Sequence, residues 1–206
     1  MSLTEDQIIR YSRQILLAQI GGRGQEKLLV CGAQLVGRGA AQATAAAYLA
    51  AGGIPVRAEV QPDANVRSDE AGLLFARAEV GQPFALALTR AAADLNPDAA
   101  SDGGRGLLGE VPADFSGAGP WVALGWRQGR GEVVYRSERG CGECFRGQLR
   151  GLSSVPAGSQ SVLVGTVGAL VFQRLCLGAS DDLGVVTTDR EGEFQAAAVN
   201  RCSRCA

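Results

Sequence analysis

The stretch Leu28-Leu29-Val30-Cys31-Gly32-Ala33-Gln34-Leu35-Val36-Gly37 carries the pattern on which the fold prediction rests. Its first four residues form an apolar run typical of a buried strand, and this strand leads directly into Gly32. The Ala-rich segment 40–51 then predicts a closely packed helix, and the alternating segment 54–60 predicts a second strand. Together these segments predict one β-α-β unit, with Gly32 to Gly37 as the turn between its first strand and its helix.

The rest of the chain continues this alternation of helices and strands. Further helices are expected over 4–17, 25–28, 70–78, 83–95 and 161–177, and further strands over 121–126, 132–135, 183–187 and 194–199. The segment 98–119 is rich in Gly, Asp and Pro and predicts a loop, a linker or weak structure. The whole pattern indicates a Rossmann-like α/β fold with a mostly parallel sheet and flanking helices.

Length, charge and composition narrow the class of protein. A chain of 206 residues is in the range of one domain, and its 20 Lys and Arg nearly balance its 21 Asp and Glu. We therefore expect one domain and no nucleic-acid partner. The chain contains no His, which excludes imidazole metal ligands and Ser-His or Cys-His nucleophile pairs. By this reading no apolar run reaches the roughly 18 residues that cross a bilayer, and residues 1–10 are polar, so we expect a cytoplasmic protein without membrane contact.

Two Cys-x-x-Cys pairs predict a metal site. Cys141 and Cys144 form the first pair, and Cys202 and Cys205 form the second. Four thiolates from two turns complete the tetrahedral sulfur shell that structural zinc prefers, although an iron-sulfur cluster or redox-active thiols are the alternatives. Cys31 and Cys176 lie in apolar segments and are interpreted as buried core residues.

The turn from Gly32 to Gly37 has the position of a phosphate-binding turn but lacks its residues. Gly32 and Gly37 are the candidate cofactor-binding glycines, whereas Gln34 stands where the fingerprint needs a second glycine. The Gln34 side chain would occupy space that a phosphate needs, so nucleotide affinity should fall sharply. A helix-packing turn without a ligand is the alternative interpretation.

Several motifs taken together resemble one known family, the ThiF/MoeB group of ubiquitin-activating-type adenylyltransferases. The motifs are Arg10-Tyr11-Ser12-Arg13-Gln14-Ile15-Leu16-Leu17, the Gly-Gly-x-Gly-Gln-Glu-Lys-Leu stretch 21–28, the degenerate turn, both Cys-x-x-Cys pairs, and the shorter stretches 80–83, 95–97 and 164–168.

The resemblance implies a zinc-bearing α/β domain that uses ATP to adenylate the C-terminal glycine of a ubiquitin-like or sulfur-carrier protein. It divides the chain into an N-terminal helical arm (1–27), a nucleotide-binding half (28–97) and a shortened C-terminal half with the zinc site (98–206). Arg13 matches the family arginine that reaches across a dimer into the partner's ATP site. The alternative for Arg13 is an exposed helix residue or a fold contact.

The departures from the family fall on residues of the nucleotide site. The ribose-binding acidic residue has only Glu59 or Asp63 as counterparts, the Arg-Gln pair is replaced by Glu70-Ala71-Gly72, and Phe84 replaces a lysine. The metal-binding Asp of the Asp-Asn motif is missing, and Ser154 replaces a cysteine.

We therefore expect zinc as the cofactor. We interpret the chain as a noncatalytic protein that helps present a carrier protein or peptide. For this role we expect a homodimer, or a heterodimer with an active paralogue. The alternatives are an active ATP- and Mg²⁺-dependent adenylyltransferase and a peptide-recognition module whose cleft accepts an extended tail.

Overall fold

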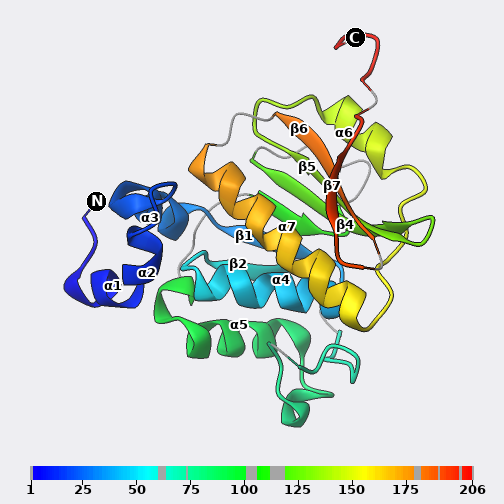
Figure 1. Cartoon of the computed structure of the whole chain (residues 1–206). Coiled ribbons are helices and arrows are strands. Elements are labelled where there is room, and N and C mark those ends of the chain that lie inside the picture. The colour runs from blue at the N-terminus through cyan, green and yellow to red at the C-terminus, as the bar shows by residue number, and fades with distance from the viewer. Residues whose placement is uncertain are drawn as a thin grey trace.

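The computed structural model describes residues 2–59, 64–72, 74–100, 106–111, 119–178, 182–189, 191–199 and 201–205. Its centre is a seven-stranded sheet in the order β2-β1-β3-β4-β5-β6-β7 (Figure 1). The first four strands in that order are parallel, and the other three extend the sheet with antiparallel pairing. The strands are β1 (Ala33–Val36), β2 (Val56–Glu59), β3 (Gly106–Gly109), β4 (Trp121–Arg127), β5 (Arg130–Arg136), β6 (Leu183–Thr188) and β7 (Phe194–Ala197).

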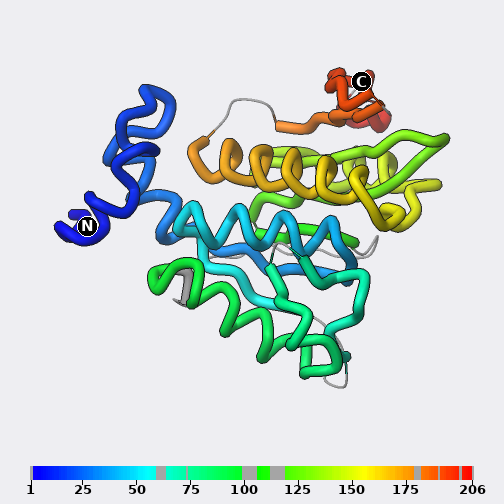
Figure 2. Tube along the Cα trace, turned by 60° about the horizontal axis from the view of Figure 1, so that its bottom comes forward, coloured from blue at the N-terminus to red at the C-terminus, as the bar shows by residue number. Residues whose placement is uncertain are grey.

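Helices cover both faces of the sheet and extend from one end of it. The helices are α1 (Glu5–Arg10), α2 (Ser12–Ile15), α3 (Gly21–Val30), α4 (Ala40–Ala51), α5 (Phe84–Leu95), α6 (Gly142–Leu149) and α7 (Ser159–Leu177), with short 3-10 turns η1 (Arg77–Glu79) and η2 (Pro97–Ala100). The larger core lies between the sheet and α4, α5 and α7, whereas a smaller core on the other face includes Trp121 and Phe145 of α6. Figure 2 shows the N-terminal helices projecting from one side of this body.

Glycines allow α7 to pack closely against α4 and the sheet. A Cβ on Gly165 would lie 2.3 Å from the carbonyl oxygen of Ala41, and one on Gly168 would lie 2.3 Å from Leu124 Cδ2. Within the described residues, α7 alone is long and apolar enough to cross a membrane by length and composition, with 44% of the tested window buried. The core helix of a soluble protein passes the same test, but the expectation that no apolar segment reaches this length is wrong.

The N-terminal helices are fastened to the body through Tyr11. Tyr11 is 1% exposed, and its hydroxyl donates to Asp98 Oδ2 (2.8 Å) and accepts from Asn96 Nδ2 (2.6 Å). Arg10 Nη1 and Gln7 Nε2 donate to the same carboxylate at 2.6 and 3.1 Å. Burial acts to raise the pKa of Asp98, but these hydrogen bonds outweigh it and hold that pKa below its ordinary value.

Most of the expected elements are present, and three expectations need correction. The predicted strand 28–31 is wrong, because Leu28 to Val30 end α3 and the strand begins at Ala33. The predicted helix 70–78 is also wrong, since its described residues form turns and the start of η1. Cys31 and Cys176 are not free core residues: they form a disulfide between the end of α3 and the last turn of α7. Within the segment 98–119, η2 and β3 are regular, and residues 101–105 and 112–118 lie outside the described residues.

Candidate functional site

The two Cys-x-x-Cys pairs meet in space as predicted. Cys141 is the N-cap residue of α6 and Cys144 lies in its first turn, while Cys202 and Cys205 follow β7 along the C-terminal segment. The four Sγ atoms all lie within 4.8 Å of one another, and Cys144 is 2% exposed. The backbone N–H of Cys202 also donates to Cys144 Sγ at 3.1 Å, which fixes the C-terminal turn against α6.

The spacing and the electrostatics of this cluster fit a bound cation. Two sulfurs of a tetrahedral zinc site are about 3.8 Å apart when each Zn–S bond is about 2.3 Å, and Cys141 Sγ lies 3.8 Å from Cys202 Sγ. A hydrogen bond from the Cys144 backbone N–H lowers the pKa of the Cys141 thiol to about 6, whereas contacts with Cys141 and Cys202 raise the pKa of Cys205 to about 12. Four thiolates at this distance repel one another unless a cation joins them, so the cluster can hold a metal such as zinc.

A second site lies where the parallel strands end. The chain passes from β1 to β2 on one side and later enters β3 on the other side of β1, so β1 and β3 flank the switch point of the sheet. Ligands of open α/β sheets bind in the crevice at this point. Gly37 follows β1 and Glu110 follows β3, so both residues lie at this crevice.

The turn with the position of a phosphate-binding turn does not begin at Gly32, as the sequence indicated, but at Gly37. Gly32 precedes β1 and Gly37 follows it, so the two predicted cofactor-binding glycines lie at opposite ends of a strand. Gln34 belongs to β1 and does not lie in the turn, which removes the argument that its side chain blocks a phosphate. The strand-to-helix turn is Gly37-Arg38-Gly39, where both glycines have positive φ (76° and 130°) and α4 begins at Ala40.

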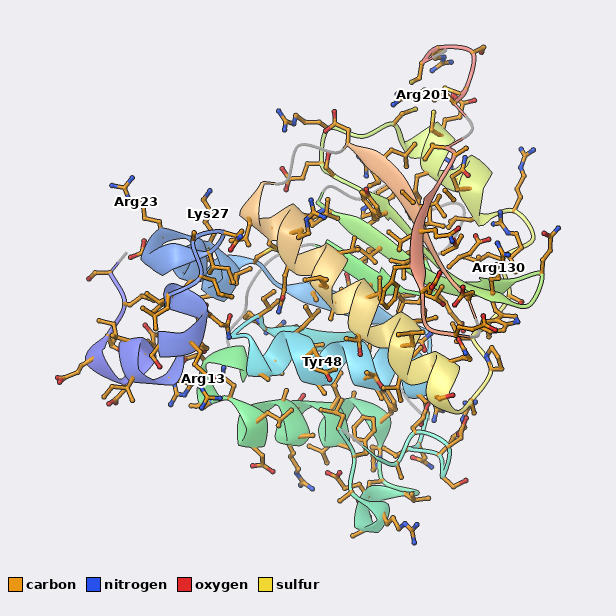
Figure 3. All side chains as sticks on the ribbon, viewed as in Figure 1. Arg13, Arg23, Lys27, Tyr48, Arg130 and Arg201 are labelled. Atoms are coloured by element: carbon orange, nitrogen blue, oxygen red, sulfur yellow. A yellow bond between two sulfur atoms is a disulfide. The ribbon has the colours of Figure 1, made fainter. Side chains whose placement is uncertain are left out.

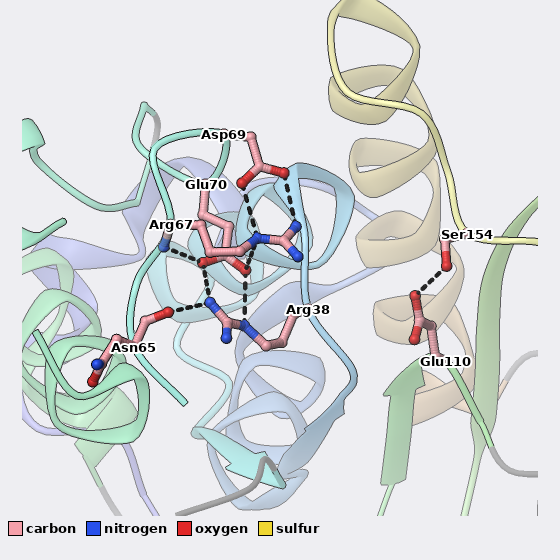
Figure 4. A network of polar contacts seen from close by, with 7 residues as sticks. All are labelled: Arg38, Asn65, Arg67, Asp69, Glu70, Glu110 and Ser154. Atoms are coloured by element: carbon pink, nitrogen blue, oxygen red, sulfur yellow. Dashed lines mark hydrogen bonds and ion pairs between the residues drawn. The ribbon is translucent and has the colours of Figure 1, made fainter. Parts of the chain in front are cut away.

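Arg38 of this turn is held by the carboxylate of Glu70 (Figure 4). Its Nε and Nη2 donate to Glu70 at 3.1 and 2.8 Å, Nη2 also donates to the Asn65 carbonyl, and the guanidinium lies 5.2 Å from the ring centre of Phe84. Glu70 is 2% exposed and also accepts from the Arg67 backbone N–H at 2.8 Å. Arg67 in turn makes two hydrogen bonds to Asp69, at 2.9 and 2.7 Å.

The opposite wall of the crevice presents an acidic residue that sequence reasoning missed. Glu110 Oε1 accepts from the Ser154 hydroxyl at 2.9 Å, and a Cβ on Gly37 would lie 2.8 Å from Glu110 Oε2. The Glu110 carboxylate therefore lies directly beside the glycine turn. Its sequence signal was an acidic residue one glycine after the apolar pair Leu107-Leu108, inside a segment interpreted as a loop, a linker or weak structure.

The remaining predicted residues are placed only in part. Phe84 begins α5 and is buried, and its ring packs edge-on against Phe75 and beside the guanidinium of Arg38. Glu59 ends β2, and Asp63 lies outside the described residues. Arg13 is exposed on α2, and Figure 3 shows its side chain at the edge of the N-terminal helices; among the described residues no ion pair reaches it.

Comparisons with known proteins agree with the resemblance over part of the chain. No protein-family model matches. The chain is 33% identical over 98 residues to the sulfur carrier protein adenylyltransferase of Thermus thermophilus, covering 47% of this chain and 36% of that protein. It is 35% identical over 99 residues to the SAMP-activating enzyme E1 of Haloferax volcanii, covering 48% of this chain and 37% of that protein. The match thus spans little more than a third of either relative.

Solved structures share the fold over nearly the whole chain. A crystal structure of PaaA superposes with a TM-score of 0.69 at 14% identity, covering 96% of this chain and 84% of that one. A crystal structure of E. coli MccB with ATP gives 0.67 at 15% identity, covering 96% and 72%. The sequence relatives support a likeness to the ThiF/MoeB-type, ubiquitin-activating-enzyme-like proteins over about half of the chain, and the solved structures show a shared fold over nearly all of it.

Proposed function

We propose that this chain is a noncatalytic member of the ThiF/MoeB-like family. It dimerises, with itself or with an active paralogue, and helps present a sulfur-carrier or ubiquitin-like protein or a peptide. The observation that carries the proposal is the Glu110 carboxylate beside Gly37. A glycine turn at the start of a helix attracts phosphate through its N–H groups and the helix dipole. Here that turn faces a carboxylate of the same chain, which disfavours a second anion.

The neighbouring cations compensate for this carboxylate only in part, because Arg67 attracts Glu110 electrostatically but gives its hydrogen bonds to Asp69. Arg38 is bonded to Glu70 and Arg67 is bonded to Asp69, so both positive charges are balanced inside the protein. Phe84 stands where the resemblance implies a lysine, and it contributes no charge. Stabilising a transferred phosphate depends on preorganised positive charge, and this crevice offers little that is free.

The N-terminal helices supply the surface for the proposed dimer. Leu16 is 84% exposed, Ile9 is 68% exposed, and Arg13 lies between them in sequence with its charge exposed. Apolar side chains with this exposure around one cation suit a protein interface with an arginine at its centre. In the proposed heterodimer, Arg13 reaches the nucleotide site of the active partner.

One observation favours the alternative, an active adenylyltransferase. Glu110 follows β3 at the switch point, where an oxygen ligand for Mg²⁺ would be useful to a bound nucleotide. The sequence comparison with a sulfur carrier protein adenylyltransferase supports the same class of substrate for either function. A Mg²⁺ ion between Glu110 and a phosphate would turn the carboxylate from an obstacle into a ligand.

Sedimentation velocity combined with nucleotide-dependent melting tests the proposal. The wild-type chain is expected to sediment as a dimer at micromolar concentration, and Leu16→Glu is expected to make it a monomer. Leu95→Glu, at an exposed leucine of α5, serves as the matched control and should leave the dimer intact. The melting temperature should not change with ATP and Mg²⁺. A wild-type monomer would contradict the homodimer, and a clear nucleotide-dependent rise in melting temperature would contradict the noncatalytic function.

A further inference from the structure

A cavity of about 410 Å³ opens beside the crevice, between the end of β3, the middle of β4 and the segment 149–154. Its volume lies near the lower end of the range for ligand sites, about 300–1,000 Å³. Its apolar lining includes Val111, Leu124, Leu149 and Leu152, and its polar groups include the bonded pair Glu110 and Ser154. The cavity therefore combines an apolar floor with one carboxylate at its side.

The edge of β4 that borders this cavity is incompletely paired. β4 pairs with β3 only from Trp121 to Ala123, and Trp126 then exchanges backbone hydrogen bonds with Ser153 at 2.8 and 3.0 Å. Between these pairings, no described residue is paired with Leu124 or Gly125 on this edge. An extended peptide of two or three residues can continue the line of β3 along this gap and bond to the backbone of β4.

The charge of the cavity selects the chemistry of its ligand. No basic side chain is among the described residues that line it. On the opposite wall of the crevice, the guanidinium of Arg67 is bonded to Asp69 and that of Arg38 is bonded to Glu70. Ser154 donates to one oxygen of Glu110, which leaves the other oxygen as an acceptor. A ligand with a free carboxylate or phosphate would face this charge without a partner, whereas a cation would pair with it.

We propose that this cavity binds a short extended peptide segment whose primary ammonium group contacts Glu110. The methylene stem of a lysine, or the first residues after an amino terminus, would lie on the apolar floor while the ammonium group meets the carboxylate. One carboxylate and one hydroxyl provide too few oxygens for a divalent cation without other ligands, but they suit an ammonium group. This inference concerns a different ligand from the nucleotide and goes beyond the proposed function.

NMR titration of ¹⁵N-labelled full-length protein tests this inference with blocked tripeptides. The probes are acetyl-Ala-Lys-Ala-amide, the same peptide with norleucine or Glu in place of Lys, and unblocked Ala-Ala-Ala-amide. The lysine probe should shift the amide signals of Gly109, Leu124 and Ser154 and bind at least about tenfold more tightly than the norleucine probe. The Glu probe should not bind. Binding of the unblocked probe would identify an amino terminus as the source of the ammonium group, and its failure would identify lysine.

Variants of Glu110 decide whether the carboxylate is responsible. Glu110→Gln should remove the preference for lysine over norleucine, and Glu110→Asp should keep part of it. Glu191→Gln, at an exposed carboxylate outside this cavity, is the matched control and should bind as the wild type does. Glu110 is exposed, so these variants should fold, and their melting temperatures check this. The inference is overturned if no probe shifts those amides at millimolar concentration, if norleucine binds as well as lysine, or if the preference survives in Glu110→Gln.

Discussion

Replacing Cys144 with Ser should remove the metal and destabilise the chain measurably. Cys144 is the most buried of the four ligands, and its sulfur lies 58 positions from Cys202 in the sequence. If the bound zinc acts as a cross-link across this distance, the loop-closure entropy it removes from the unfolded chain corresponds to about 4 kcal/mol. For a domain of this size, 1 kcal/mol changes the melting temperature by about 2–4 °C, so we expect a drop of about 8–16 °C.

Metal analysis and thermal melting in reducing buffer check this expectation together. The wild type should contain one zinc ion per chain and Cys144→Ser close to none. Cys176→Ser is the matched control, because it removes a sulfur outside the cluster and should keep the zinc. Adding a chelator to the wild type should reproduce the melting temperature of Cys144→Ser. A Cys144→Ser protein with full zinc content and an unchanged melting temperature would refute the assignment, and a brown colour with iron in the wild type would show an iron-sulfur cluster.

Three further predictions concern stability. In urea unfolding, Gly165→Ala should lower the free energy of unfolding by about 1–3 kcal/mol, because its methyl group would meet the Ala41 carbonyl oxygen. Gly147→Ala should raise it by about 0.5–1 kcal/mol, because Gly147 has open space around it in α6. The pKa of Asp98 is lowered in the folded chain, so the stabilisation from its carboxylate is present above the ordinary value of 3.8 and is lost as the pH falls further. The free energy of unfolding, followed from pH 6 to 2, should therefore fall less steeply in Asp98→Asn than in the wild type. Equal slopes for the two proteins would contradict this. Reducing the Cys31–Cys176 disulfide, which joins residues 145 positions apart, should lower the free energy of unfolding by up to about 5 kcal/mol. If reductant lowers the free energy of unfolding of a Cys31→Ser variant equally, the disulfide is not the cause and the prediction is wrong.

The sequence predicted those elements whose own residues determine their structure. The helix 40–51 was placed correctly because its alanines suit both a helix and close packing, and Gly52 follows it. The strands β4 and β5 were expected from the runs 121–126 and 132–135 around a Gly-Arg-Gly turn. The turn between them is instead formed by Gln128 and Gly129, both with positive φ, because Arg130 and Gly131 already belong to β5. The metal cluster was predicted for the same reason, since the spacing of its ligands is local within each pair.

The wrong predictions fall where two neighbouring apolar segments both fit a strand, or where an element has too few residues to show a pattern. Leu28 to Val30 and Leu35-Val36 are both apolar, and only tertiary packing shows that the first belongs to α3 and the second to β1. Because the strand was predicted five residues too early, the phosphate-binding turn was placed at Gly32 instead of Gly37-Arg38-Gly39, and Gln34 was assigned a role that it does not have. Glu110 was missed because β3 has only four residues, two of them glycines, and its pairing with β1 is invisible in the sequence. The Cys31–Cys176 disulfide joins distant segments and has no local signal.

The central claim is that the crevice beside Gly37 does not bind a nucleotide, and isothermal titration of the zinc-loaded protein with ATP and Mg²⁺ tests it most directly. Glu110→Gln is titrated in parallel, because it removes the carboxylate on which the claim depends. The account predicts no measurable heat of binding for the wild-type protein while it remains folded. Micromolar binding by the wild type, lost in Glu110→Gln, would contradict the account and identify Glu110 as a ligand of the nucleotide-bound magnesium.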